Sequence, residues 1–472
     1  MENTTAKLLR RLEYLVYRRI PMLLFGLCAR EKWKPLLSST SKVMTRLGVY
    51  SWHAFKLSLW LCLGIYTHAS MALAAPDARS TFELTHDAIY QIRVMDIVAN
   101  NKTSTGSGFV IDSNGLIATN YHVVSSAVNT ADKYRIELLQ NDESVVYIAD
   151  IVNVDIVNDL ALLRVKDLRA PVLTLAESAM AQGDTAYAIG FPYDLGVTVV
   201  PGTYNGLAPH SASERVHFTG SLNPGMSGGP ALNTLGEVIG INVASAGNQV
   251  SFLIPVARLQ ALYAATPLDQ ERDLKDTMRQ QLVDNSERMI DQMLNGNWQL
   301  VPLGRAKALD EITGFLRCWG DSQNQQEQLD ATPFWAQRSC QTDHNIFVSS
   351  NLMTGKIELQ FYWLETADLN SAQFYAHYEQ IFSRYRPGND GREEDLGRWS
   401  CENAFVNASD EVTKTVFCAR GYDAMSGLYD VLFLQGSVSH AHEAYIAHFT
   451  LAGTTRELAE KFTRRFVQTG AW

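Results

Sequence analysis

Long hydrophobic runs are scarce in this 472-residue sequence. The first strongly apolar window after the basic N-terminal stretch is LSLWLCLGIY, residues 57–66, whereas a membrane-spanning helix needs about 20 residues. A window of this length is typical of the hydrophobic region of a signal peptide. Ala72-Leu73-Ala74 then supplies the small-x-small pattern that a signal peptidase accepts, so we expect Ala75 to be the mature N-terminus.

The whole leader, residues 1–74, would be unusually long for a signal peptide. Met44 opens a shorter version, because MTRLGVYSWHAFK provides Arg46 and Lys56 as the positively charged segment ahead of the apolar window. We therefore expect synthesis to start at Met44. The alternative is that residues 1–43 persist as a basic amphipathic arm on anionic lipid, which would hold the protein at the inner membrane.

Positive charge is scarce beyond this leader. Residues 1–56 contain eleven Lys or Arg and three Glu, a net charge of +8, so the remaining residues carry −18 of the chain's total of −10. Affinity for nucleic acid depends largely on Lys and Arg that neutralise phosphates. The acidic body therefore argues against a nucleic-acid partner.

Cysteine is also scarce, and most of the chain has none. Two of the six cysteines fall in the leader and four lie near the C-terminus, an arrangement typical of an exported protein with disulfides. Folding WSCENAFVN and VTKTVFCARG into a hairpin about ASDE brings Cys401 opposite Cys418, which leaves Cys318 with Cys340. The alternative, four unpaired thiols in a cytosolic protein, would require that the leader is not a signal peptide.

Three segments with different patterns follow the leader. Residues 75–265 consist of short apolar or alternating runs cut by Gly, Asn, Asp and Pro, which predicts an all-β barrel or sandwich. Residues 266–296 predict a linker helix with Thr266 as its cap, whose apolar residues recur near helical spacing and suit packing against a neighbouring domain. Residues 297–472 mix alternating strands with helical segments and predict a separate α+β domain.

Three polar residues of the β-rich segment suit nucleophilic catalysis. An alcohol attacks a peptide carbonyl when a base lies within hydrogen-bond reach, a carboxylate orients that base, and backbone amides stabilise the oxyanion. His122 follows an apolar run in TNYHVV, and Asp159 precedes another in VNDLALLRV. Ser227 lies in the turn LNPGMSGGPALN, where Gly225 permits an unusual backbone path.

These blocks, with GSGFVIDSNGLIATN ahead of the histidine, resemble the trypsin-fold serine proteases, and in particular the HtrA-like (Deg) bacterial branch, over residues 88–262. The resemblance implies an all-β double barrel of six strands each. It also implies His122 as general base, Asp159 as its orienting acid and Ser227 as the acylated nucleophile. The amides of Gly225 and Ser227 would form the oxyanion hole.

The sequence departs from this family in two places. Met226 stands where digestive trypsins have an acidic residue and where HtrA proteins typically have Asn, so activation by an ion pair with a new N-terminus is not available. The PDZ domain that usually follows in HtrA proteins is not apparent after Pro255. The resemblance is therefore extended to the chemistry and not to cage assembly.

The resemblance also places a substrate-binding region. Ser221 would lie at the floor of the specificity pocket, and its neutral side chain favours small or medium apolar side chains at the cleavage position. One further segment would pair with an extended substrate by strand addition: Asn242, Val243, Ala244 and Ser245.

The predicted function is that of an exported serine endopeptidase, periplasmic or secreted, which acts on envelope proteins or on one dedicated partner. HAHEAYIAH places three histidines close together but lacks the HExxH spacing, and we predict neither a metal nor a cofactor. The alternative is a catalytically silent module of the same fold that only binds peptides. The physiological substrate and the oligomeric state stay open.

Overall fold

A computed structural model describes the chain from Asp77 to Thr469, with short gaps. The expected signal peptide, its cleavage before Ala75 and the start at Met44 lie outside the described residues. Within residues 77–469 the undescribed positions are 141–144, 179, 268–271, 324–331, 344, 387, 390, 393–394 and 409–410.

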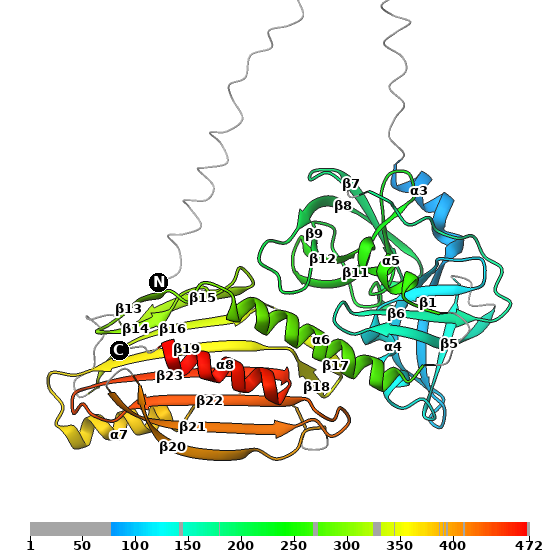
Figure 1. Cartoon of the computed structure of the whole chain (residues 1–472). Coiled ribbons are helices and arrows are strands. Elements are labelled where there is room, and N and C mark those ends of the chain that lie inside the picture. Colours follow the sequence, from blue (N-terminus) through cyan, green and yellow to red (C-terminus); the bar gives the residue numbers. More distant parts are fainter. Residues whose placement is uncertain are drawn as a thin grey trace, which may run out of the picture. The chain divides into compact units, whose positions relative to one another are not determined.

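Six antiparallel strands close into a first barrel in the order β1-β2-β3-β6-β5-β4 (Figure 1). Its core holds fully buried side chains such as Ile92, Ile117 and Leu163. The chain enters through α3 (Ala78–Thr85) and the short 3-10 helix η1 (His86–Ala88), and α4 (Tyr121–Asn129) follows β3. The strands are β1 (Ile89–Asp96), β2 (Asn101–Val110), β3 (Leu116–Thr119), β4 (Tyr134–Leu139), β5 (Val146–Asp155) and β6 (Leu160–Val165).

A second closed barrel has the order β10-β11-β12-β9-β8-β7. The predicted double barrel of six strands each is thereby confirmed. The 3-10 helix η2 (Pro192–Asp194) follows β7, and α5 (Val256–Ala264) follows the last strand. The strands are β7 (Thr185–Gly190), β8 (Thr198–Leu207), β9 (Val216–Phe218), β10 (Pro230–Leu232), β11 (Val238–Gly247) and β12 (Val250–Pro255).

The next long helix, α6 (Leu274–Leu294), begins later than the linker helix expected from residue 266. Its N-cap is Asp273, whose carboxylate accepts the amides of Lys275 and Asp276 at 2.9 and 3.2 Å. The prediction of Thr266 as the cap is wrong, because its hydroxyl donates to the carbonyl of Leu262, in the last turn of α5, at 2.6 Å.

Helix α6 contributes to two hydrophobic cores. Met278 and Leu282, in its first half, are buried in the core of the first barrel. Met289 and Met293, in its second half, are buried in the core of the following sheet. The apolar spacing therefore marks packing, as expected, with successive turns of one helix serving different partners.

The chain then forms a seven-stranded antiparallel sheet in the order β15-β16-β19-β23-β22-β21-β20. The residues of α6 and α8 pack on one face of this sheet, and those of α7 pack on the other. Two small hairpins, β13–β14 and β17–β18, lie outside it. The elements are β13 (Leu300–Leu303), β14 (Ala306–Leu309), β15 (Leu316–Ser322), β16 (Phe334–Thr342), β17 (Ile346–Ser349), β18 (Leu352–Thr354), β19 (Ile357–Glu365), α7 (Ser371–Phe382), β20 (Ser400–Ala408), β21 (Glu411–Gly421), β22 (Tyr429–Ser437), β23 (Glu443–Thr454) and α8 (Arg456–Thr469).

Two disulfides join the outermost strands of this sheet to their neighbours. Cys318 of β15 bonds Cys340 of β16, and Cys401 of β20 bonds Cys418 of β21. In each case the two cysteines lie directly opposite each other in the strand register. For Cys401 and Cys418 this is the register that the expected hairpin about ASDE requires. Closing loops of 22 and 17 residues stabilises the folded state by about 3 kcal/mol each, mainly by restricting the unfolded chain.

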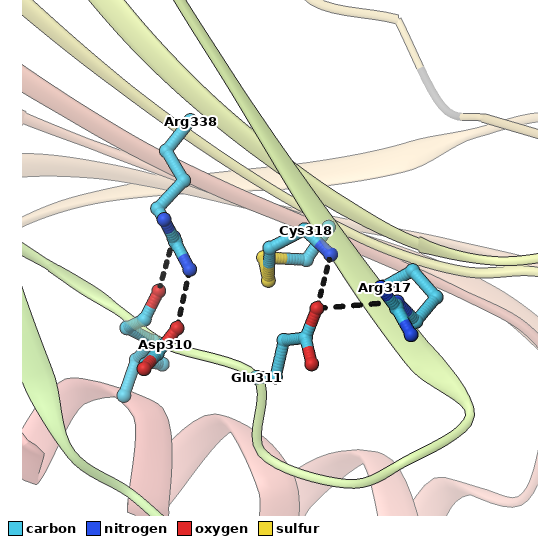
Figure 2. The surroundings of a disulfide bond; sticks show 7 residues. Asp310, Glu311, Arg317, Cys318 and Arg338 are labelled. Carbon is cyan, nitrogen blue, oxygen red and sulfur yellow. Dashed lines mark hydrogen bonds and ion pairs between the residues drawn. A yellow bond between two sulfur atoms is a disulfide. The ribbon is translucent and has the colours of Figure 1, made fainter. Parts of the chain in front are cut away.

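Charged groups tie the β14–β15 loop to the first disulfide (Figure 2). The carboxylate of Glu311 accepts the amide of Cys318 at 3.3 Å and pairs with the guanidinium of Arg317 at 3.2 Å. Arg338 of β16 donates to the carbonyl of Leu309 at 3.1 Å and pairs with Asp310. These contacts fix the loop against the strands that the disulfide joins.

Candidate active site

His122 lies in the first turn of α4, directly after β3. Asn120, two residues before His122, is fully buried, and its side-chain amide donates to the carbonyl of Asp159 at 2.8 Å. Gly106 of β2 lies against the same turn, because a Cβ added there would come within 2.6 Å of the side chain of Val123. The close approach of β2 to α4 therefore places the histidine at the surface of the first barrel.

Asp159 holds His122 through both carboxylate oxygens. Oδ1 accepts a hydrogen bond from the backbone amide of His122 at 2.9 Å, and Oδ2 accepts one from the ring nitrogen Nδ1 at 2.7 Å. Because a carboxylate only accepts, Nδ1 carries the proton and Nε2 keeps its lone pair. Asp159 has a φ of 62°, a left-handed conformation that aspartate tolerates better than most side chains.

The pair also sets the proton affinity of the imidazole. Burial disfavours the charged ring, but the charge and the hydrogen bond of Asp159 outweigh burial, so the pKa of His122 is raised from its ordinary value of 6.5. A base with a raised pKa accepts a proton from an alcohol more readily. Such a pair can act as an orienting acid and a general base.

Ser227 also lies close to Gly106. A Cβ at Gly106 would meet the carbonyl oxygen of Ser227 at 3.1 Å, and that carbonyl accepts the amide of Ser107 at 2.7 Å. The hydroxyl of Ser227 donates to the carbonyl of Val243 at 3.3 Å, and the described residues include no hydrogen bond between it and His122. The structure thus joins His122 to Asp159, and holds Ser227 against the strand next to them.

The peptide planes of the serine turn direct two amides outward. The carbonyl of Pro224 accepts the amide of Tyr193 at 3.0 Å, and the carbonyl of Met226 accepts that of Gly229 at 3.1 Å. In a trans peptide the N–H points opposite to the C=O, so the amides of Gly225 and Ser227 point away from these partners. Neither amide has a hydrogen-bond acceptor among the described residues. Two free donors from one turn can stabilise an oxyanion.

Gly225 is required by this geometry, and its replacement by alanine provides a test. Its φ is 98°, and an added Cβ would lie 2.3 Å from the carbonyl oxygen of Phe191. We expect Gly225→Ala to lower kcat/KM by about 10²- to 10³-fold, the usual effect of losing an oxyanion donor, and to lower the melting temperature. The measurements are peptide hydrolysis and thermal unfolding.

A matched control separates backbone strain from the steric clash. Gly183 has a φ of 101°, and a Cβ added there meets no atom within 4 Å. Gly183→Ala should cost some stability and leave hydrolysis unchanged. Equal effects of the two variants on hydrolysis would contradict the role assigned to Gly225.

Met226, the residue before Ser227, anchors the serine turn by apolar packing, where digestive trypsins use an ion pair. Its side chain is fully buried in the core of the second barrel, beside Ala188, Ala231 and Leu253. Packing, rather than charge, therefore anchors this side of the serine turn.

The predicted substrate-binding residues are divided between exposed and buried positions. Ser221 is exposed, whereas Asn242 is fully buried and its amide donates to the carbonyls of Ile189 and Met226 at 3.0 and 3.4 Å. Asn242 thus supports the serine turn rather than facing a substrate. Strand β11 is paired with β10 only up to Ile241, so beyond the turn its edge, from Val243 through Ala244 to Ser245, is unpaired with β10.

One supporting residue was missed in the sequence. Ser107 is fully buried, and its hydroxyl donates to the carbonyl of Gly225 at 2.7 Å and accepts the amide of Phe191 at 3.0 Å. It therefore links β2 to the serine turn and to the residue that follows β7. The sequence signal for this residue is GSG, the first three residues of the block GSGFVIDSNGLIATN that resembles the family.

Comparisons with known proteins find similarity to serine proteases. Residues 106–241 match the family model of the trypsin-like peptidase domain. Serine protease HTRA1 of Xenopus tropicalis is 36% identical over 172 residues, which cover 34% of this chain and 36% of the relative. The Chlamydia trachomatis protein named "Probable periplasmic serine endoprotease DegP-like" is 33% identical over 171 residues, 35% of this chain and 33% of the relative. The crystal structure of a serine endoprotease from Yersinia pestis is 27% identical with a TM-score of 0.35, covering 40% of this chain and 65% of that one.

The chain spans about a third of the length of these two sequence relatives. The matched segment contains His122, Asp159 and Ser227 in that order. Residues 106–241 are therefore a trypsin-like peptidase domain, homologous to the serine proteases of the HtrA and Deg family.

Proposed function

We propose that the chain is an exported serine endopeptidase that hydrolyses peptide bonds of envelope proteins or of one dedicated partner. The observation that carries this proposal is the pair of hydrogen bonds that Asp159 accepts from the backbone amide and the ring of His122. One carboxylate that binds both the backbone amide and the ring fixes the orientation and the tautomer of the imidazole, which a general base requires and a purely structural histidine does not.

The proposed cycle uses only side chains and amides described above. Nε2 of His122 takes the proton of the Ser227 hydroxyl as the oxygen attacks the substrate carbonyl. The amides of Gly225 and Ser227 stabilise the oxyanion, and the protonated imidazole returns its proton to the leaving amine. Water then enters, and the same imidazole activates it to release the acyl group.

The proposed location is the periplasm or the exterior. Support comes from the two disulfides, which form in oxidising compartments, and from the relative that is named periplasmic. Among the described helices none is long and apolar enough to cross a membrane. The leader, residues 1–74, would supply the export signal, and residues 297–472 would form the appended α+β domain.

Labelling with a fluorophosphonate tests the proposal directly. Such a probe reacts only with a serine that a neighbouring base activates, so we expect the wild-type protein to be labelled on the peptide that contains Ser227. Mass spectrometry after digestion locates the label.

The alternative is a silent peptide-binding module. In its favour, the hydroxyl of Ser227 donates to the carbonyl of Val243 and not to the ring of His122. Absence of label at Ser227, where a known trypsin-like enzyme is labelled, would support that alternative. Digestion of unfolded casein into many fragments would separately exclude strict specificity for one partner.

A further inference from the structure

A hairpin from beyond the barrels lies against the catalytic histidine. Phe347 of β17 has its ring centroid 6.2 Å from that of His122, with the two rings nearly perpendicular, and 6.3 Å from that of Tyr121. Perpendicular aromatic pairs at this spacing are favourable contacts. The residues predicted for the site all lie before residue 266. Phe347 therefore adds a residue from the C-terminal region to the site.

The hairpin is anchored to the helix that carries His122. The Tyr121 hydroxyl, fully buried, donates to the carbonyl of Val348 at 2.6 Å, and the amide of Asn129 donates to the same carbonyl at 3.2 Å. Burial raises the pKa of Tyr121, which keeps this hydroxyl protonated and able to donate. The side chains of Ile346 and Val348 are buried in the core of the first barrel.

A β-bulge directs these residues. The register of β17 against β18 shifts between Phe347 and Ser349, so the carbonyl of Val348 is free to accept from Tyr121. Bulges often turn a side chain toward a functional site. Here the partly buried ring of Phe347 lies beside His122 while its two neighbours face the core.

A cavity of about 600 Å³ is lined jointly by this hairpin, by α4 and by β2. Its lining includes Thr103, Ser104, His122, Phe347 and Asn351. None of the residues 221–227 or 242–245 lines it. The cavity therefore lies on the side of the histidine away from the predicted pocket and substrate-binding strand.

The cavity and the predicted substrate-binding strand lie on different sides of His122, and this sets the direction in which a substrate would bind. The half before the cleaved bond would pair with β11, where Ser227 bonds Val243. The half after the bond must pass His122, because this imidazole protonates the leaving amine. That half would enter the cavity beside Phe347.

We propose that Phe347 and the β17–β18 hairpin form a specificity subsite for the first residue after the cleaved bond, and that this subsite takes an uncharged, apolar side chain. The inference rests on the proposed function. The cavity is also lined by Lys275 and Asp395, whose opposite charges together favour neither sign of charge. Beside His122, the ring of Phe347 gives an apolar side chain buried contact. The C-terminal region thereby contributes to substrate choice at the active site.

The test compares peptides that differ only in the residue after the cleaved bond, Leu or Asp, in a sequence that the wild type cleaves. A p-nitrophenyl ester with the same acyl half reports the half that does not reach the cavity. We expect wild type to favour Leu, and Phe347→Ala to reduce the Leu-to-Asp ratio of kcat/KM by about tenfold. Any loss on the ester should be smaller than the loss on the Leu peptide.

Two variants make the comparison specific. Phe405→Ala removes a phenylalanine that is 71% exposed on β20, and should leave the ratio unchanged. Phe347→Leu keeps apolar volume, and should retain most of the preference for Leu, which also covers a failure of the alanine variant to fold.

Each contrary result has a distinct meaning. An unchanged ratio in a folded Phe347→Ala, or an equal loss on peptide and ester, would overturn the subsite while leaving the proposed protease intact. A rise in activity on all substrates would show the hairpin to be an inhibitory cover instead. Wild-type protein that cleaves neither peptide nor ester would overturn the proposed function, and the subsite with it.

Discussion

Ser227→Ala is expected to lower kcat for peptide-bond hydrolysis by about 10⁶-fold while leaving KM nearly unchanged. In the proposed mechanism the hydroxyl oxygen is the only atom of this residue that bonds to the substrate, whereas the backbone amide, which would stabilise the oxyanion, remains in place. The residual rate should come from the oxyanion hole and from substrate binding. Mass spectrometry of cleavage products over long incubations measures it.

A suitable control is Ser400→Ala, which removes an exposed serine of β20. It should cleave as the wild type does. Ordinary cleavage by the Ser227→Ala variant, at the same sites, would mean that another residue is the nucleophile.

Asp159→Asn should lower kcat by about 10⁴-fold. Asparagine has nearly the same shape and also tolerates the left-handed φ of 62°, so the fold should be preserved. Its amide donates to ring nitrogen Nδ1, which must then give up its proton to Nε2. An imidazole with Nε2 protonated cannot take a proton from Ser227.

The same substitution should move the acid limb of the pH profile. In the wild type the pKa of His122 is raised, so activity falls as the pH drops through a value above 6.5. Without the carboxylate, burial of the ring is less opposed and the pKa of His122 falls, so the residual activity should persist to lower pH.

Asp167→Asn is the matched control for this prediction. Asp167 is exposed and has a φ of 60°, so the control makes the same chemical change in the same backbone conformation. It should alter neither kcat nor the pH profile. An Asp159→Asn variant with a wild-type profile would show that Asp159 does not orient the base.

The local and the distant parts of the site differ in how far they were predictable. His122, Asp159 and Ser227 each stand beside a strand or turn with a strong local pattern. The spacing of the strands predicts a barrel or sandwich, and the resemblance to the trypsin-fold proteases implies the two closed barrels. The second disulfide followed from a hairpin that joins Cys401 to Cys418 across one short turn. In all of these cases the determining residues are close in sequence or belong to a motif.

The missed features depend on packing between distant segments. Thr266 has the side chain of a helix cap, but α5 ends just before it and its hydroxyl is used there instead. Asn242 was expected at the substrate and instead bonds Met226 beneath the serine turn. Phe347 lies in a strand-like run, as many other aromatic residues of the chain do, so the sequence does not single it out. The bulge in β17 and the hydrogen bond from Tyr121 to Val348 place it beside His122.

The positions of the disulfides in the seven-stranded sheet bear on its behaviour among unfolded proteins. An outer strand of a sheet presents free amides and carbonyls, which a foreign chain can use to add itself or to displace that strand. Here both outer strands, β15 and β20, are covalently fastened to the next strand inward. A foreign chain could therefore displace an outer strand from the sheet only after the disulfide of that strand had been reduced.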